Sequence, residues 1–339
     1  MDVSHLRRSA GGIPRYVRGL TAALSERNDV SVIRLGDGPR EDRGIRKKLL
    51  TAQLDLLWYP VIVRRRAARA KADVLHCPAP RGPLRRGRPP LVVTLYDLVP
   101  FRFPETMTRW SLLYARATHR RMLMAADRII CISDDTANDL VNIIGVTHDR
   151  IRVVPLGIDS HFFEALPPGD PPPEPYILFV GNQEPRKNLE RLQNAVAILR
   201  GRGFPHVLVV AGAGAWGAVS LTRPFVRRLG GVTETELRRL YADAACLALP
   251  SLHEGFGLPA LEAMAAGTPV VASHAGSLPE VTGGAAVLVD PLDPVDIARG
   301  LEAAITDSAD LRAGGPLRAA QFTWQRAAKE TVAVYRELV

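Results

Sequence analysis

The chain has 339 residues, of which 47% are hydrophobic and 23% charged, and its formal net charge is +9. This length suits two domains of roughly 150 to 170 residues, and the composition excludes a disordered protein. The three cysteines, Cys77, Cys131 and Cys246, form no C-x-x-C pair. We therefore expect neither a disulfide framework nor a structural zinc site, and we interpret each cysteine as a small buried hydrophobe in a reducing compartment.

The positive charge is concentrated in the first half of the chain. Residues 1–165 hold 28 Lys or Arg against 17 Asp or Glu, net +11, whereas residues 166–339 hold 16 against 18, net −2. This asymmetry favours an anionic partner such as a membrane surface, a phosphorylated substrate or nucleic acid, and the alternative is a merely arginine-rich solvated surface. The longest apolar run, Leu49–Val63, is shorter than the ~20 residues that span a bilayer. We expect no signal peptide, because residues 1–10 lack an apolar stretch.

Short apolar runs alternate with amphipathic ones on both sides of a proline-rich segment, PPGDPPPEP at residues 167–175. We expect one domain at 1–166, a linker at 167–175 and a second domain at 176–339, and leave open whether the last helix packs back on the first domain. The alternation predicts parallel sheets covered by helices on both faces, with ligands beyond the carboxyl ends of the strands and a site in a cleft between the domains. The expected strands are Val30–Leu35, Val74–Cys77, Leu91–Leu95, Arg128–Ser133, Ile151–Val154, Tyr176–Gly181, His206–Ala211, Cys246–Pro250, Pro269–Ser273 and Ala286–Val289. The expected helices include Pro14–Glu26, Thr108–Ala125, Asn188–Arg200, Thr235–Ala244 and Pro259–Ala266.

The start of the chain is irregular. Gly11 and Gly12 are typical of a loop between a first strand and the helix Pro14–Glu26, but only Met1–Ser4 remains to form that strand. We expect either an unusually short first strand or a true start several residues upstream.

The segment Pro250–Ser273, PSLHEGFGLPALEAMAAGTPVVAS, carries the strongest functional signal. A strand is expected to end at Pro250, and a glycine-containing loop leads to a helix that starts near Pro259. Glycines allow a ligand close to the backbone, and a helix N-terminus attracts phosphate. Glu254 precedes the loop and Glu262 is placed in the first turn of the helix, so one carboxylate could bond a sugar hydroxyl and the other a ribose diol.

This segment resembles the E-x(seven)-E signature of the retaining GT-B glycosyltransferases of group 1 or family 4. Further segments resemble the same family: GNQEPRKNLERL at 181–192, VTETELRRLYADAACLALPS at 232–251 and FTWQRAA at 322–328, with weaker matches at 11–20, 94–100, 132–140 and 153–159. The resemblance implies a GT-B fold, in which two doubly wound Rossmann-like domains face a central cleft. It implies that the N-terminal domain binds the acceptor and the C-terminal domain the nucleotide-sugar donor.

The resemblance also implies roles for individual residues. Arg186 and Lys187 would hold the donor diphosphate, Glu262 the ribose, and Glu254 the donor sugar. The loop residues that would hold the sugar with Glu254 are Gly255, Phe256, Gly257 and Leu258, and Gly11 and Gly12 would meet the phosphates across the cleft. A leaving diphosphate needs stabilisation by a metal or by paired cations, which the Arg-Lys pair can supply. The alternative for the pair is a solvated turn.

One position departs from the family pattern. The segment Thr94–Pro100 commonly has a histidine before the aspartate, and here that position is Tyr96. We predict that Tyr96 lines the donor-sugar pocket as a hydrogen-bonding wall and that Asp97 holds the loop or meets the acceptor; the alternative is that Tyr96 points into the core.

Several other patterns are weaker. No D-x-D motif occurs, so we expect no metal and no other cofactor, and we assign Asp290, Asp293 and Asp296 to turns and caps. The G-x-G-x-x-G at Gly212–Gly217 fits a dinucleotide fingerprint but lacks a good helix behind it. His76 either faces the cleft or is a satisfied core histidine, and His253 shapes its loop.

Together these features predict a retaining, metal-independent transferase that moves a hexose, with mannose or rhamnose favoured, from an NDP-sugar. The acceptor would be a glycan, a lipid-linked glycan or a small molecule, as in bacterial polysaccharide biosynthesis. The alternative is a catalytically impaired GT-B scaffold or binding subunit of a glycosyltransferase complex. We expect a cytoplasmic protein, with weak binding to an anionic membrane at the inner face of the plasma membrane as a further expectation, and no nucleic-acid partner.

Overall fold

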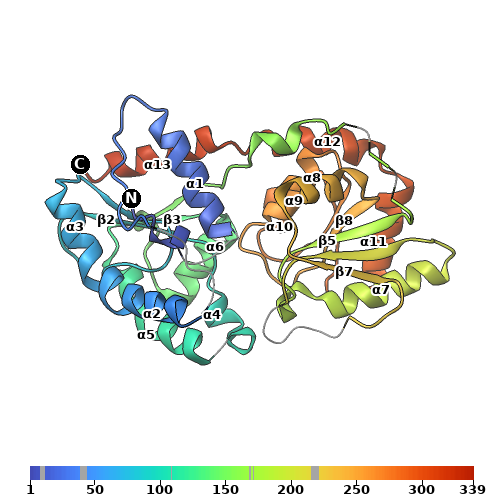
Figure 1. Cartoon of the computed structure of the whole chain (residues 1–339), viewed down its shortest axis with the longest axis horizontal. Coiled ribbons are helices and arrows are strands. Elements are labelled where there is room, and N and C mark those ends of the chain that lie inside the picture. The colour runs from blue at the N-terminus through green and yellow to red at the C-terminus, as the bar shows by residue number, and fades with distance from the viewer. Residues whose placement is uncertain (8–11, 39–43, 108, 168, 171, 215–220) are drawn as a thin grey trace. The chain divides into compact units, whose positions relative to one another are not determined.

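The computed structural model describes the chain except for residues 8–11, 39–43, 108, 168, 171 and 215–220 (Figure 1). The chain forms two compact units. The first contains Met1–Pro104, Arg109–Gly157 and Phe322–Val339, and the second contains Glu105–Thr108 and Ile158–Gln321. The C-terminal segment therefore does pack back on the first unit.

The division between the units lies at Gly157, before the proline-rich segment 167–175 at which the sequence predicted it. The short helical turn η6 (Ser160–Phe163) explains the difference, because it packs on the second unit. The Phe162 ring meets the Tyr241 ring edge-on at 6.1 Å between centroids, and His161 lies 3.1 Å from Glu234. These contacts join the chain to the second unit before the prolines begin.

The first unit is built on a parallel sheet in the order β1-β2-β3-β4, formed by Leu75–Cys77, Leu91–Leu95, Arg128–Cys131 and Ile151–Val153. Alternate strand residues face opposite sides, so each strand contributes to two cores. Its helices are α1 (Gly12–Ser25), α2 (Gly44–Gln53), η2 (Leu54–Ile62), α3 (Val63–Arg69), α4 (Val99–Arg102), α5 (Arg109–Ala125), α6 (Asp134–Asp139), η4 (Leu140–Ile144) and α13 (Trp324–Arg336). On one face Leu75, Val93 and Ile129 pack with α3 and α5.

Helices α1 and α13 lie over the other face of this sheet (Figure 1), and a chain of polar side chains holds them there. The Tyr16 hydroxyl lies 2.9 Å from Thr94 Oγ1, which lies 2.8 Å from His76 Nε2, and His76 Nδ1 lies 2.6 Å from the Tyr335 hydroxyl. Burial lowers the pKa of His76 to about 3. His76 is therefore the satisfied core histidine that the sequence left as one of two alternatives.

The expected strand at Val30–Leu35 is wrong. Its only sheet-like pairing among the described residues is a single bridge between Asp2 and Leu35. The bridge is parallel and joins only the last residue of this segment to Met1–Val3, and the helical turn η1 (Ser4–Arg7) follows Val3 at once. Every other predicted strand is present to within one or two residues.

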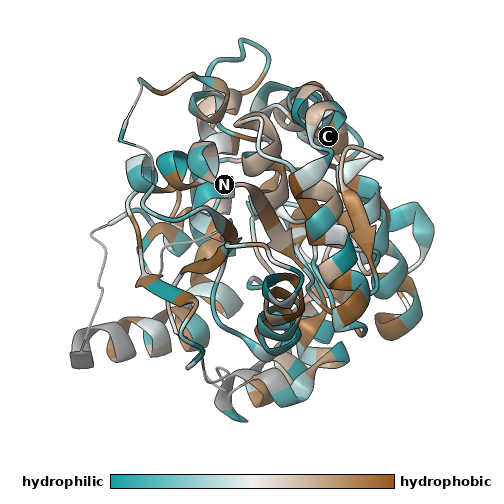
Figure 2. Ribbon diagram, turned by 90° about the vertical axis from the view of Figure 1, so that its right-hand side faces the viewer, coloured by the Kyte–Doolittle hydropathy of each residue, from teal (hydrophilic) through white to brown (hydrophobic). Residues whose placement is uncertain are grey.

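The second unit has a six-stranded parallel sheet in the order β10-β9-β8-β5-β6-β7. Its strands are β5 (Tyr176–Val180), β6 (Val207–Ala211), β7 (Val226–Gly230), β8 (Cys246–Leu249), β9 (Val270–Ser273) and β10 (Val287–Val289); its helices are α7 (Leu189–Gly201), α8 (Glu234–Asp243), α9 (Leu258–Ala265), α10 (Leu278–Thr282), α11 (Pro294–Thr306) and α12 (Ala309–Ala319). The central strands are buried except for the half-buried Val180 at the end of β5, and Figure 2 shows brown, hydrophobic strands among helices of mixed colour. The strand order reverses between β5 and β8, and such switch points are where doubly wound sheets bind ligands.

The edge strand β7 was missed in the sequence. It is the outermost strand of its sheet and exposes Arg227, Arg228 and Leu229, so it lacks both the apolar run and the alternation that indicate a strand.

Over the described residues, no helix combines the length and apolarity required to cross a membrane.

Trp324 fixes the start of α13 against two glycines. A Cβ atom at Gly19 would lie 2.2 Å from the Trp324 ring, and one at Gly157 would lie 2.4 Å from the Trp324 backbone nitrogen. We predict that Gly19→Ala lowers the free energy of unfolding by about 1–3 kcal/mol, because the added methyl overpacks this contact. The matched control is Gly12→Ala in the same helix, where nothing lies within 4 Å of the added atom. Equal thermal denaturation of the two variants would contradict this packing account.

Candidate functional site

Two loops flank the switch point of the second unit. The first runs from Gly181, after β5, through the helical turn η7 (Pro185–Lys187) to Asn188, before α7. The second runs from Pro250, after β8, to Gly257, before α9. Because β5 and β8 are parallel neighbours, both loops leave the same edge of the sheet.

Asn188 ties these loops together. It has a left-handed backbone (φ 61°), which asparagine tolerates better than most residues, and its side-chain amide donates to the carbonyl oxygens of Pro250 at 2.9 Å and Pro291 at 2.6 Å. A further bond runs from the Leu252 backbone N–H to the Arg186 carbonyl oxygen at 2.8 Å. Three loops are thus held in one arrangement.

Glu254 lies at the centre of a buried charge cluster with both predicted cations. Lys187 Nζ donates to Glu254 Oε1 at 2.5 Å, and Arg186 Nη1 lies 3.3 Å from Glu254 Oε2. The exposed fractions of these side chains are 10% for Lys187, 14% for Arg186 and 9% for Glu254. The solvated-turn interpretation of the Arg-Lys pair is therefore wrong.

The cluster keeps Glu254 ionised. Burial alone would raise the pKa of its carboxyl, but the charges of Lys187 and Arg186 and the hydrogen bonds from Lys187 and Ser251 outweigh burial and lower the pKa from 4.5 to about 2. Arg186 is also bonded through Nε to Glu184 at 2.9 Å and through Nη1 to the His253 carbonyl oxygen at 2.9 Å. A diphosphate that binds these cations must compete with carboxylates of the protein.

The backbone of Glu254 is fixed as firmly as its side chain. Its carbonyl oxygen accepts bonds from Ser277 Oγ at 2.9 Å and from the Ser277 backbone N–H at 3.1 Å, and Ser251 Oγ donates to Glu254 Oε1 at 2.7 Å. Gly276 makes this approach possible, because its Cβ would lie 2.8 Å from the Glu254 carbonyl oxygen and its φ is +63°. Gly257 begins α9 with φ 103°.

Glu262 lies in the second turn of α9 and not in the first, as the sequence predicted, because the helix begins at Leu258. Its side chain is 2% exposed, and its Oε2 accepts a bond from the Tyr241 hydroxyl at 2.7 Å. Tyr241 thereby orients the carboxylate that the resemblance assigns to the ribose.

Four of the predicted site residues belong to the first unit: Gly11, Gly12, Tyr96 and Asp97. Gly11 lies outside the described residues, and Gly12 is exposed at the start of α1. The Tyr96 hydroxyl donates to the Pro78 carbonyl oxygen at 2.8 Å, and Asp97 Oδ1 accepts from the Val99 backbone N–H at 3.2 Å. Asp97 thus holds its loop, while the roles of these residues toward a substrate stay predictions.

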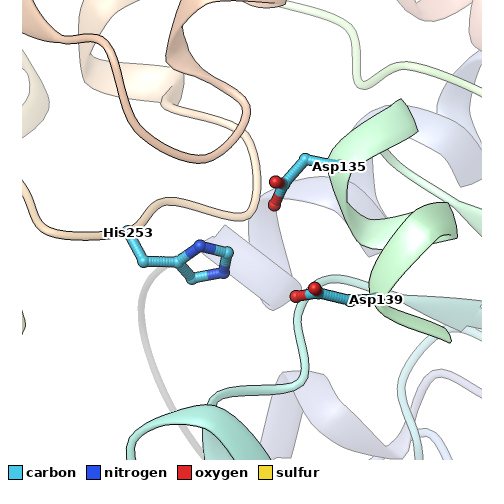
Figure 3. A group of neighbouring side chains, drawn as sticks. All are labelled: Asp135, Asp139 and His253. Atoms are coloured by element: carbon cyan, nitrogen blue, oxygen red, sulfur yellow. The ribbon is translucent and has the colours of Figure 1, made fainter. Parts of the chain in front are cut away.

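Figure 3 shows three further polar side chains, Asp135 and Asp139 on α6 and His253 on a loop. Asp135 and Asp139 project from one side of α6, one turn apart, and Arg102 Nη1 lies 3.0 Å from Asp139 Oδ2. His253 belongs to the loop before α9 in the second unit and is 1% exposed.

The turn and cap roles predicted for Asp290, Asp293 and Asp296 are confirmed. Asp290 and Asp293 accept bonds from backbone N–H groups two residues on, Asp293 caps α11, and Asp296 accepts from the Asp290 N–H. Gly212 has no room for a side chain because its Cβ would lie 2.0 Å from the Gly181 carbonyl oxygen, and residues 215–217 of the same motif lie outside the described residues. The three cysteines are free and buried.

Comparison with known proteins decides the family. The family described as "Glycosyl transferases group 1" matches residues 174–307, and "Glycosyltransferase Family 4" matches residues 10–162. O-antigen chain mannosyltransferase B of Escherichia coli is 31% identical over 267 residues, which cover 73% of this chain and 70% of that protein. The chain belongs to the glycosyltransferases of group 1 and family 4.

Other relatives of this glycosyltransferase match over smaller shares. The MMP alpha-(1->4)-mannosyltransferase of Mycolicibacterium hassiacum is 33% identical over 65% of this chain and 56% of its own length. A D-inositol 3-phosphate glycosyltransferase of Nocardioides is 33% identical over 64% of this chain and 55% of its own length. This chain thus spans little more than half of these two relatives.

Solved structures confirm the GT-B fold class. Sucrose-phosphate synthase from Thermosynechococcus elongatus has a TM-score of 0.72 at 22% identity and covers 99% of this chain and 98% of its own. Anabaena HepE in complex with UDP and glucose has a TM-score of 0.70 at 17% identity, with 97% of each chain covered. At these identities the likeness shows the fold alone.

The low pKa of Glu254 predicts how the stability of the glycosyltransferase depends on pH. A carboxyl with a pKa of about 2 when folded and about 4.5 when unfolded stabilises the protein above pH 4.5, and this contribution is lost as the pH falls toward 2. In Glu254→Gln the free energy of unfolding should therefore fall by about 2 kcal/mol less between pH 5 and pH 3 than in the wild type. Chemical denaturation at pH 5 and pH 3 measures this. The surface variant Glu190→Gln should keep the wild-type slope, and an unchanged slope in Glu254→Gln would contradict the cluster.

Proposed function

We propose that the chain is a retaining hexosyltransferase that uses an NDP-sugar donor without a metal ion. The observation that carries the proposal is the Arg186–Lys187–Glu254 cluster at the switch point of the second unit. Two cations fixed beside a helix N-terminus suit a diphosphate, whose negative charge grows as the sugar leaves.

In the proposed reaction the bond between the sugar C1 atom and the diphosphate oxygen breaks, and a bond forms between C1 and the acceptor oxygen. Arg186 and Lys187 stabilise the charge on the departing diphosphate. The acceptor hydroxyl proton passes to the diphosphate oxygen on the same face of the sugar, which accounts for retention. This front-face route needs no protein nucleophile.

Donor binding would redistribute the charges of the cluster. The positive charges of Lys187 and Arg186 are balanced by Glu254 and Glu184 in this structure. When a diphosphate takes over the cations, the Glu254 carboxylate becomes available to accept a bond from a sugar hydroxyl. Glu262, oriented by Tyr241, would accept from the ribose diol.

Mannose is the sugar we favour, because two relatives are named mannosyltransferases, one of them for an O-antigen chain. A glycan or lipid-linked glycan in polysaccharide biosynthesis is the corresponding acceptor. The scaffold-subunit alternative gains no support from a site in which both cations and both carboxylates are present and buried or half-buried.

Arg186→Ala should weaken donor binding by roughly 10- to 100-fold, since a hydrogen bond to a charged group contributes about 1.5–3 kcal/mol. Calorimetric titration with GDP-mannose and UDP-glucose, together with the nucleoside diphosphates alone, measures this. Lys187→Ala is less suitable because it leaves the buried Glu254 carboxylate without its nearest cation. Arg202→Ala, which removes an exposed partner of Glu302, is the control and should bind like the wild type. Equal affinities for Arg186→Ala and wild type would place the diphosphate elsewhere.

Transfer should continue after chelation. With glycan acceptor and saturating donor, EDTA should leave most of the turnover, and NMR should show the donor's anomeric configuration in the product. Loss of turnover that Mg²⁺ or Mn²⁺ restores would contradict the metal-free proposal, and inversion at C1 would contradict retention.

A further inference from the structure

The first unit carries a basic hollow of about 540 Å³. It lies between the helical run η2–α3 and the loop at residues 83–88, which leads into β2. Five arginines line it: Arg64, Arg65, Arg85, Arg86 and Arg88. We call this surface the arginine hollow.

The arginine hollow concentrates positive charge on this surface. Among the described residues, none of its five arginines forms an ion pair with a carboxylate, although ion pairs are common elsewhere in the unit. Arg64 Nη1 donates to the Arg85 carbonyl oxygen at 2.8 Å, while Arg64 Nε and Nη2 are buried and have no hydrogen-bond partner in the described structure. Burial lowers the pKa of Arg64. Arg65, Arg85, Arg86 and Arg88 are exposed and can therefore donate to an anion at this place.

The helical run that lines the arginine hollow also exposes apolar side chains. Leu56 and Leu57 on η2 are 63% and 54% exposed, and Val61, which lines the hollow, is 41% exposed. The same helical run then supplies Arg64 and Arg65. A soluble anion would require only the arginines. The three exposed apolar side chains on the same helical run therefore favour a ligand that is both anionic and apolar.

The arginine hollow is at the amino edge of the sheet. Its loop precedes β2, Arg64 interacts with the charge of Asp127 immediately before β3, and Arg86 interacts with Arg150 immediately before β4. Ligands of doubly wound sheets bind at the opposite, carboxyl edge. The arginine hollow is thus separate from the edge at which this unit would contribute to transfer.

We propose that the arginine hollow, with Leu56, Leu57 and Val61, docks the protein on an anionic lipid bilayer. Guanidinium groups match the geometry of lipid phosphates, and exposed leucines enter the boundary between headgroups and acyl chains. The excess of positive charge in the first half of the chain steers this surface toward a negatively charged membrane. This proposal goes beyond the transfer reaction and does not depend on it.

Co-sedimentation with vesicles tests the proposal. The full chain should bind vesicles of equal parts phosphatidylglycerol and phosphatidylcholine, should bind pure phosphatidylcholine at least tenfold less, and should be released as salt rises. The variant Arg85→Ser/Arg86→Ser/Arg88→Ser should bind the anionic vesicles at least tenfold more weakly. The matched control is Arg223→Ser/Arg227→Ser/Arg228→Ser, which removes three exposed arginines at β7 of the second unit and should bind like the wild type.

A second variant separates a bilayer from a soluble anion. Leu56→Ser/Leu57→Ser leaves every arginine in place and should also weaken vesicle binding, with an unchanged melting temperature as evidence of folding. Wild-type vesicle binding by this leucine variant would show that charge alone acts there and would overturn the proposal. Equal binding to neutral vesicles, or equal losses in the two arginine variants, would overturn it too. Donor titration of the same proteins reports on the proposed transferase separately and should be unchanged.

Discussion

The buried ion pair between Lys187 and Glu254 is the interaction on which the proposed donor site depends. It joins the loop after β5 to the loop after β8 at the point where the strand order of the sheet reverses. A buried charge is costly unless it is paired and hydrogen-bonded, and here each partner satisfies the other. The remaining contacts of the two loops, from Asn188, Ser251 and Ser277, hold this pair in a single geometry.

That constraint links folding to chemistry. A site that must stabilise a developing diphosphate charge performs best when its cations are fixed before the substrate arrives, because reorganisation then costs little during the reaction. The carboxylate of Glu254 fixes them, and its own charge is preserved by the same contacts that lower its pKa. We infer that Glu254 occupies the two cations in the free protein and that a bound diphosphate replaces this carboxylate as their partner.

The sequence predicted most of the second unit, because its strands are short apolar runs bounded by glycine and proline and its site motif is contiguous. It could not predict Asn188 or Tyr241 as supporting residues, because each reaches a partner that is distant in the sequence: Pro250 and Glu262. Tyr96 was difficult for a related reason. A tyrosine at the end of a buried strand fits both a pocket and a core, and only the position of the Pro78 carbonyl oxygen shows what its hydroxyl contacts. Local pattern likewise failed at Val30–Leu35, because a strand requires a hydrogen-bonded neighbour along its length and here the neighbouring segment pairs only with Leu35.

A crystal structure with a bound nucleoside diphosphate tests the central claim most directly. The account predicts that diphosphate oxygens lie about 2.7–2.9 Å from Arg186 and Lys187 nitrogens, as in charge-assisted bonds, and that the ribose hydroxyls reach Glu262. The distance between Lys187 Nζ and Glu254 Oε1 should then lengthen from its present 2.5 Å. A diphosphate bound away from both cations, with the Lys187–Glu254 pair unchanged, would contradict the account.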